Sequence, residues 1–139
     1  MTTSESIFQW LEKEGYNPHF DEDKNICFKV DRIPYIFFHD DKDERFLRFC
    51  IPGVFDVTDD NQENMLRYIN EINMMFKSVK AILTPTNNVW IISESWSNAI
   101  PEYGDILPQI FDMMKDAVII LYDLINGRTE PFQSSSTPL

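Results

Sequence analysis

The hydrophobic positions of this chain follow two different spacings. Ile26, Phe28 and Val30 alternate with other residues, as side chains do along one face of a β-strand. Intervals of three and four residues, which place side chains on one face of a helix, relate Met65, Ile69, Ile72 and Phe76. The pattern therefore predicts a chain that contains both strands and helices.

Eight elements are expected from these spacings and from the turn residues between them. Helices are predicted over residues 4–14, 60–77 and 105–125, and strands over residues 25–30, 33–39, 46–51, 79–83 and 89–96. A short additional strand near residues 19–20 is left open. Pro52 and Gly53 are expected to end the third strand. The order α-β-β-β-α-β-β-α, with strands joined as hairpins, is typical of a two-layer α+β fold with an antiparallel sheet.

The composition favours one well-packed domain. Of the 139 residues, 43% are hydrophobic and 14% are aromatic, which is more than a disordered chain carries. We expect a single domain over residues 1–126. A disordered tail is predicted over residues 127–139, because Ser, Thr and Pro dominate that segment.

The chain is strongly acidic. Its formal net charge is −11, and residues 1–64 hold 15 Asp and Glu against seven Lys and Arg. Nucleic acids and anionic membranes bind basic surfaces, so the composition argues against both as partners. The longest apolar run, residues 117–122, is far short of the ~20 residues of a membrane helix. The N-terminal residues do not resemble a signal peptide, and a cytoplasmic location is predicted.

Residues that usually carry catalysis or bind metals are few and poorly spaced. Cys27 and Cys50 are expected to be free thiols, since a bridge would need their strands to be neighbours. His19 and His39 lack metal-ligand spacing. Residues 21–25 open like a calcium loop, but the glycine and the final glutamate of that motif are missing. The sequence therefore predicts no catalytic residue, no cofactor and no metal site, and the chain is not expected to be an enzyme.

The third predicted helix carries an apolar stripe that is wider than one packing partner needs. Its apolar residues occupy about half of the circumference, whereas a stripe of roughly 100° suffices for a helix that faces one core. Either the N-terminal helix or the C-terminal tail covers the surplus, or a second copy of the chain does. On the second interpretation, the homodimer contacts are Met114, Val118, Ile119 and Tyr122.

Two tryptophans in the last predicted strand form a second candidate surface. Trp90 and Trp96 are six residues apart and share one face of a regular strand with Ile92 and Glu94. They either pack within the hairpin or bind a partner protein, since tryptophan is enriched at binding hot spots. On the second interpretation, Phe38, which points away from the core face of its own strand, joins them.

The order of elements and several short segments resemble a known family. The segments are residues 8–16, 20–29, 35–41, 46–52, 69–73, 79–81 and 87–90, followed by the long last helix. Together they resemble the YbjN-like family of small bacterial proteins, which has a type III secretion chaperone-like fold. The resemblance implies an α+β domain that binds other proteins, commonly as a homodimer, and that acts as a chaperone or as a regulator of sensory transduction or stress. It supplies no catalytic residues.

Three functional hypotheses follow. The first is a non-enzymatic, homodimeric protein-interaction module that binds a partner of unknown identity through apolar sheet or helix surface. The alternative is an acidic inhibitor or immunity-type protein that masks a basic enzyme with its N-terminal half, including Asp40, Asp41, Asp43 and Glu44. A third is an enzyme or small-ligand domain around Trp90, Trp96 and a cysteine, which the missing catalytic groups disfavour.

Overall fold

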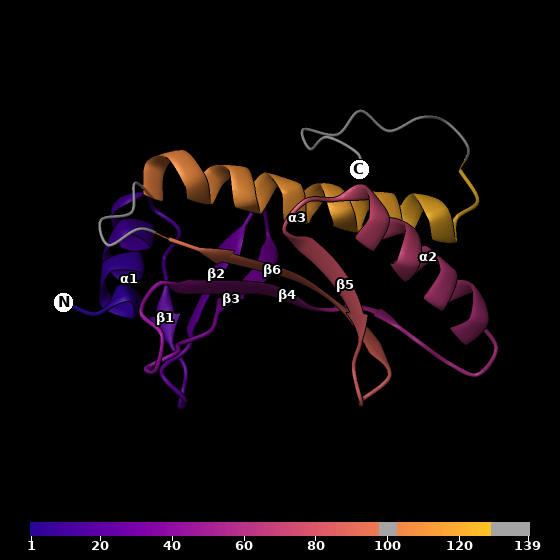
Figure 1. Ribbon diagram of the computed structural model, residues 1–139, viewed down its shortest axis with the longest axis horizontal. Coiled ribbons are helices and arrows are strands. Elements are labelled where there is room, and N and C mark those ends of the chain that lie inside the picture. The colour runs from indigo at the N-terminus through magenta and orange to yellow at the C-terminus, as the bar shows by residue number, and fades with distance from the viewer. Residues whose placement is uncertain (98–102, 129–139) are drawn as a thin grey trace.

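The computed structural model describes residues 1–97 and 103–128, which form a sheet with helices packed on one side (Figure 1). The elements are α1 (Thr3–Lys13), β1 (His19–Phe20), β2 (Ile26–Val30), β3 (Ile33–Phe37), β4 (Phe46–Asp56), α2 (Gln62–Met75), β5 (Val79–Leu83), β6 (Asn88–Trp96) and α3 (Tyr103–Ile125). The predicted α+β order is confirmed, and the short strand near residues 19–20 is present as β1.

The six strands form one antiparallel sheet in the order β1-β2-β3-β4-β6-β5. A tight turn joins β2 to β3, with Asp31 and Arg32 at φ +52° and +70°. The strand that follows is longer than predicted. Gly53 adopts φ +58°, so β4 bulges after Ile51 and then resumes its pairing with β6. The prediction that Pro52 and Gly53 end the strand was therefore wrong, because glycine tolerates the left-handed backbone that a bulge requires.

The core lies between the sheet and α3, and aromatic rings fill its centre. The ring of Phe111 on α3 lies 5.3 Å from that of Tyr35 and 5.4 Å from those of Phe28 and Phe49, measured between centroids. The Tyr35 hydroxyl donates a hydrogen bond to the Phe111 carbonyl at 3.1 Å. These contacts join α3 to β2, β3 and β4 by aromatic packing that adds to the burial of area.

The wide apolar stripe of α3 is used largely within the chain. One part of the stripe packs on the sheet and another packs against α2. Met114 is fully buried in this packing, so its side chain is not available to a second copy of the chain. Two packing partners within the same chain therefore account for much of the surplus width that the sequence shows.

Two further expectations concern the chain as a whole. No helix within residues 1–97 and 103–128 is long and apolar enough to cross a membrane. The prediction of a disordered tail falls almost entirely on residues 129–139, which lie outside the described residues.

Candidate functional site

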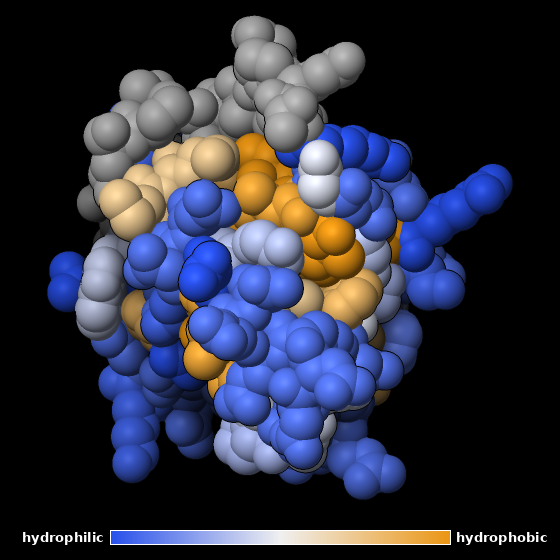
Figure 2. Space-filling view, turned by 90° about the vertical axis from the view of Figure 1, so that its right-hand side faces the viewer, coloured by the Kyte–Doolittle hydropathy of each residue, from blue (hydrophilic) through white to orange (hydrophobic). Residues whose placement is uncertain are grey.

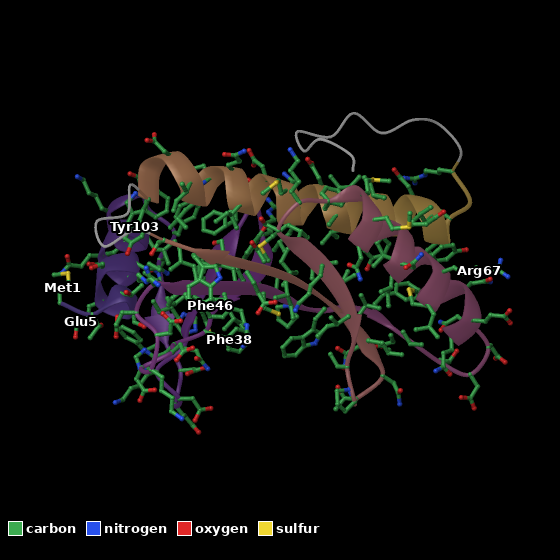
Figure 3. All side chains as sticks on the ribbon, viewed as in Figure 1. Met1, Glu5, Phe38, Phe46, Arg67 and Tyr103 are labelled. Atoms are coloured by element: carbon green, nitrogen blue, oxygen red, sulfur yellow. The ribbon has the colours of Figure 1, made fainter. Side chains whose placement is uncertain are left out.

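One face of the sheet is left uncovered by the three described helices. Alternate residues of each strand point to this side, away from α3. We call this surface the open face; its residues include Cys27, Ile36, Phe38, Phe46, Arg48, Cys50, Lys80, Ile82, Trp90, Ile92, Glu94 and Trp96. Figure 3 places Phe38 on the side of the sheet opposite α3. A sheet normally buries one face in the core, so an uncovered face rich in apolar residues is a candidate interaction surface.

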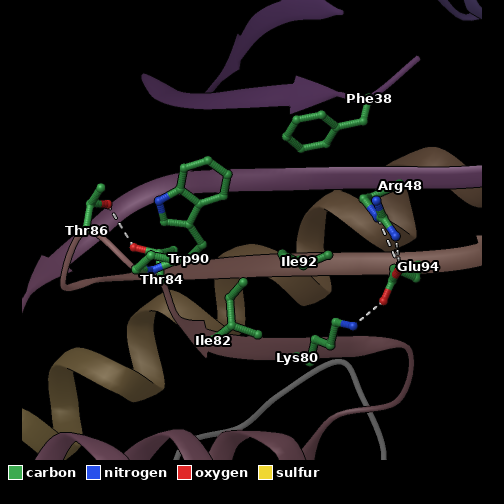
Figure 4. Close-up of a pocket in the computed structure, with 10 residues that line it drawn as sticks. Phe38, Arg48, Lys80, Ile82, Thr84, Thr86, Trp90, Ile92 and Glu94 are labelled. Carbon is green, nitrogen blue, oxygen red and sulfur yellow. Dashed lines mark hydrogen bonds and ion pairs between the residues drawn. The ribbon is translucent and has the colours of Figure 1, made fainter. Parts of the chain in front are cut away.

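A groove of about 530 Å³ is hollowed into this face along β6. Its apolar lining includes Trp90, Ile92, Ile82 and Phe38. The turn between β5 and β6, residues 84–86, closes one end. Figure 4 shows Trp90, Ile92 and Glu94 in line along β6. The lining is mainly apolar, which is typical of surfaces that bind ligands or partner segments.

An ion group lies at the other end of the groove. Glu94 accepts hydrogen bonds through Oε2 from Arg48 Nη2 at 2.7 Å and Nε at 3.1 Å. Its second oxygen, Oε1, accepts a bond from Lys80 Nζ (Figure 4). The bond from Lys80, together with Arg48, lowers the pKa of Glu94 below its ordinary value. Three strands thus bring two cations and one carboxylate together at the rim of an apolar groove.

Aromatic side chains extend the open face beyond this ion group. The Phe46 and Trp96 rings lie 5.1 Å apart between centroids. The Arg48 guanidinium lies 5.0 Å from the centre of the Phe46 ring, within the range of a cation–π contact. Phe46 and Glu94 therefore fix the Arg48 side chain from two directions.

A second hollow of about 500 Å³ lies over the N-terminal strands and contains Cys27 and His19. Burial raises the pKa of the Cys27 thiol, with a further contribution from Asp21. Ile36 on β3 is the Cα partner of both Cys27 and Cys50, so the two cysteines are about 9.5 Å apart, or two strand spacings. A disulfide needs a Cα separation below about 7 Å, and both thiols are free.

The structure places the predicted partner-binding residues on one surface. Trp90 and Phe38 line the same groove. Trp96 lies further along the open face with 65% of its surface exposed, beside Phe46 rather than in the groove. Arg48 and Lys80 were not among the predicted site residues, because the spacing along the chain does not show that their strands flank β6.

The remaining predicted dimer contacts lie on the outer part of α3. Ile119 and Tyr122 are 36% and 39% exposed, and Val118 is partly buried. The Tyr122 hydroxyl donates a hydrogen bond to the Val54 carbonyl at 2.6 Å, so this side chain is held against β4. Figure 2 shows hydrophobic side chains gathered at the end of the molecule where α2 and the end of α3 lie. The exposed large apolar side chains of these two helices are Leu66, Met74, Ile119 and Tyr122.

One serine–histidine pair appears that the sequence did not indicate. Ser4 Oγ lies 2.7 Å from His39 Nδ1, and the His39 backbone N–H donates to Asn25 Oδ1. Ser4 is only 6% exposed and lines neither hollow described above. A nucleophile needs room for its substrate, so this pair is best explained as an anchor between α1 and the end of β3.

The segment that resembles a calcium loop is a turn with local hydrogen bonds. Asp21 Oδ1 accepts the backbone N–H groups of Asp23 and Asn25, each at 2.8 Å. These bonds lower the pKa of Asp21. Within the part of the chain that the structure describes, no group of three or more His, Cys, Asp or Glu side chains could hold a metal ion.

The arrangement as a whole defines a class of small α+β domains with a six-stranded antiparallel sheet. Within this class the chain is similar to the crystal structure of YbjN from E. coli, a proposed transcription regulator. The TM-score is 0.66 at 13% identity, over 93% of this chain and 96% of that one. The chain is also similar to the crystal structure of an uncharacterized protein from Methanothermobacter thermautotrophicus. The TM-score is 0.63 at 16% identity, over 92% of this chain and 99% of that one. The expected YbjN fold is thereby confirmed.

Comparison by sequence finds no such likeness. No protein-family model and no curated protein matches the chain.

Proposed function

We propose that the protein is a non-enzymatic interaction module that binds an extended segment of a partner protein in the groove of the open face. The observation that carries this proposal is the apolar hollow of about 530 Å³ on a face that no described helix covers. Trp90 lines this hollow, and tryptophan is among the residues that dominate binding energy when a partner buries them.

A regulatory role would then act through protein contacts. E. coli YbjN, which shares the fold, is a proposed transcription regulator. The net charge of −11 disfavours direct binding to DNA by this chain. Binding to another protein is compatible with that charge.

The geometry of the acidic turn supports the inhibitor hypothesis less well than the groove supports an interaction module. Asp40 Oδ1 accepts the Lys42 N–H, and Asp43 Oδ1 accepts the Arg45 N–H. Glu44 Oε2 accepts the Thr3 N–H at 2.7 Å. These carboxylates stabilise the turn and the start of α1, which explains their presence without a basic partner.

Self-association through α3 is a second part of the proposal. Val118, Ile119 and Tyr122 form an apolar strip on the outer part of the helix. This strip is separate from the groove, so a dimer would leave both grooves free to bind partner segments.

The groove is tested by selecting displayed peptides against the folded chain and measuring their affinity for two variants. Trp90→Ser should weaken binding by roughly thirtyfold, as expected when a hot-spot aromatic residue is removed. Leu66→Ser removes an exposed apolar side chain from α2 and should leave the affinity unchanged. Peptides that bind both variants equally would contradict the proposal.

A further inference from the structure

Of the two hollows described here, the groove is the one that also carries an ion group held by hydrogen bonds. The net charge of this ion group is opposite in sign to the net charge of the chain. Arg48, Lys80 and Glu94 are the charged residues of its lining, which gives a local excess of one positive charge. The whole chain carries −11. A locally positive site on an acidic molecule favours an anionic group on whatever binds there.

The two cations retain hydrogen-bonding capacity that Glu94 does not use. A guanidinium has five N–H donors and an ammonium has three. Arg48 donates to Glu94 through Nε and Nη2, which leaves Nη1 without a bond in the described structure, and Lys80 donates to Glu94 once. The Arg48 and Lys80 side chains are about half exposed, so a second carboxylate can reach them without disturbing Glu94.

Glu94 and Phe46 hold these donors in place before any ligand binds. The Arg48 guanidinium is bonded to the Glu94 carboxylate and lies 5.0 Å from the centre of the Phe46 ring, and Lys80 is bonded to the same carboxylate. Because the donors are already oriented, a bound carboxylate avoids part of the entropic cost of ordering them.

We propose that the partner segment carries an acidic side chain that binds the N–H groups of Arg48 and Lys80 that Glu94 leaves free, four residues from an apolar side chain that packs on Trp90. This inference rests on the proposed function. Trp90, Ile92 and Glu94 occupy alternate positions on one strand, so the ends of the series are about 13 Å apart. An extended segment lying along β6 would match this spacing with apolar side chains at its first and third positions and Asp or Glu at its fifth. The same match holds in the reverse direction.

Two displayed peptide libraries test the requirement for an acidic group. Both have apolar residues at the first and third positions and Ser, Thr or Gly at the second and fourth. One has Glu at the fifth position and the other has Gln, with neutral flanking sequence in both. Selected peptides are then synthesised in both forms, and the Glu form should bind about threefold more tightly at low salt, since the ion pairs are partly exposed. This preference should shrink as salt is added.

Three variants test which residues cause the preference for the Glu peptides over the Gln peptides. Lys80→Gln should reduce the advantage of Glu over Gln, whereas Lys77→Gln, which removes an exposed cation outside the groove, should not. Glu94→Gln keeps an oxygen that accepts hydrogen bonds from the cations but removes the competing negative charge, and should tighten the binding of the Glu peptides. Weaker binding of the Glu peptides to this variant would contradict the inference.

The outcomes separate this inference from the proposed function. Peptides that require Trp90 but bind equally well with Glu or Gln would overturn the acidic requirement alone. Recovery of no Trp90-dependent peptide from either library would overturn both proposals. Peptide affinity that falls as the concentration of the chain rises would show that a second copy occupies the groove, and would also contradict the inference.

Discussion

The side-chain amide of Asn73 bonds to both backbone groups of Ala81. Asn73 Oδ1 accepts the Ala81 N–H at 2.6 Å, and Asn73 Nδ2 donates to the Ala81 carbonyl at 3.1 Å. Ala81 lies in the middle of β5, which is an edge strand of the sheet. A side chain from α2 therefore takes the position that the backbone of a further strand would occupy. This arrangement blocks strand addition at β5 and leaves the open face as the accessible surface of this part of the sheet.

Replacing Asn73 by leucine tests this function of the amide. Asn73→Leu keeps a similar side-chain volume but leaves the Ala81 N–H and carbonyl without their partner. The free energy of unfolding should fall by about 1–2 kcal/mol, and association should increase with concentration as the edge becomes free. Urea unfolding and light scattering measure the two effects. Asn70→Leu on the same helix is the control, and equal behaviour of the two variants would contradict the prediction.

Replacing Ser93 should make the protein more stable. Its hydroxyl is fully buried on the core side of β6 and has no hydrogen-bond partner among the described residues. An unpaired buried hydroxyl costs about 1–3 kcal/mol, so Ser93→Ala should raise the free energy of unfolding by about 1 kcal/mol. Ser95→Ala, a partly exposed position on the same strand, should change it by less than about 0.5 kcal/mol. A loss of stability in Ser93→Ala would show that the hydroxyl has a partner.

Much of the fold could be predicted because hydrophobic spacing reports local structure directly. The alternation of Ile26, Phe28 and Val30 and the helical stripe that contains Met65 both identify core faces, and the structure buries Ile26, Phe28 and Met65. The shared face of Trp90 and Glu94 follows from the same alternation. The extra length of β4 was missed because a proline followed by a glycine usually ends a strand, whereas here Gly53 forms a bulge.

The ion group of the groove could not be predicted, because it depends on which strands are neighbours. Arg48, Lys80 and Glu94 come from β4, β5 and β6, and β6 lies between the other two. Spacing along the chain does not contain that order. The prediction that Met114 contacts a second copy failed for a related reason. A helical wheel shows how wide an apolar stripe is, but it does not show that α2 covers part of that stripe.

Acidification should destabilise the protein below about pH 4.5. The bonds from Lys80 and Arg48 keep the pKa of Glu94 below its ordinary value of 4.5 in the folded chain. A carboxylate whose pKa is lowered by folding stabilises the protein above the unfolded pKa, and this contribution is lost as the pH falls through the folded pKa. The free energy of unfolding, measured by urea titration between pH 3 and 6, should therefore decrease toward acid.

Glu94→Gln should flatten this acid dependence, because the variant has no proton to gain at that position. Glu71→Gln, which changes an exposed residue of α2 whose side chain makes no hydrogen bond or ion pair described here, is the control and should keep the parental slope. An unchanged slope in Glu94→Gln would show that Glu94 does not contribute to the acid transition.

The two cysteines should differ in reactivity. Burial raises the pKa of Cys50 to about 12, and its side chain is fully buried. Cys27 also has a raised pKa but is partly accessible beside the second hollow. Since the thiolate is the reactive form, iodoacetamide at pH 8 should modify Cys27 slowly and Cys50 only on unfolding. Mass spectrometry of peptides from native and urea-unfolded samples measures this, and equal native rates would contradict it.

Ile119→Asp tests self-association through α3. Ile119 is on the surface, so the variant should keep its free energy of unfolding within about 0.5 kcal/mol. A charge placed in an apolar contact should raise the dimer dissociation constant at least tenfold, since burying it is costly. Sedimentation velocity at tens of micromolar measures the change.

Salt and a second variant sharpen the same experiment. Charges of both signs lie around Ile119 on α3, with Lys115 four residues before it and Asp123, which is paired with Arg128, four residues after it, so added salt should change the dimer little. Gln109→Asp adds the same charge about 15 Å further along the helix and should leave the dimer intact. A parent chain that sediments as a monomer under all these conditions would reject the α3 interface while leaving the proposal for the groove unaffected.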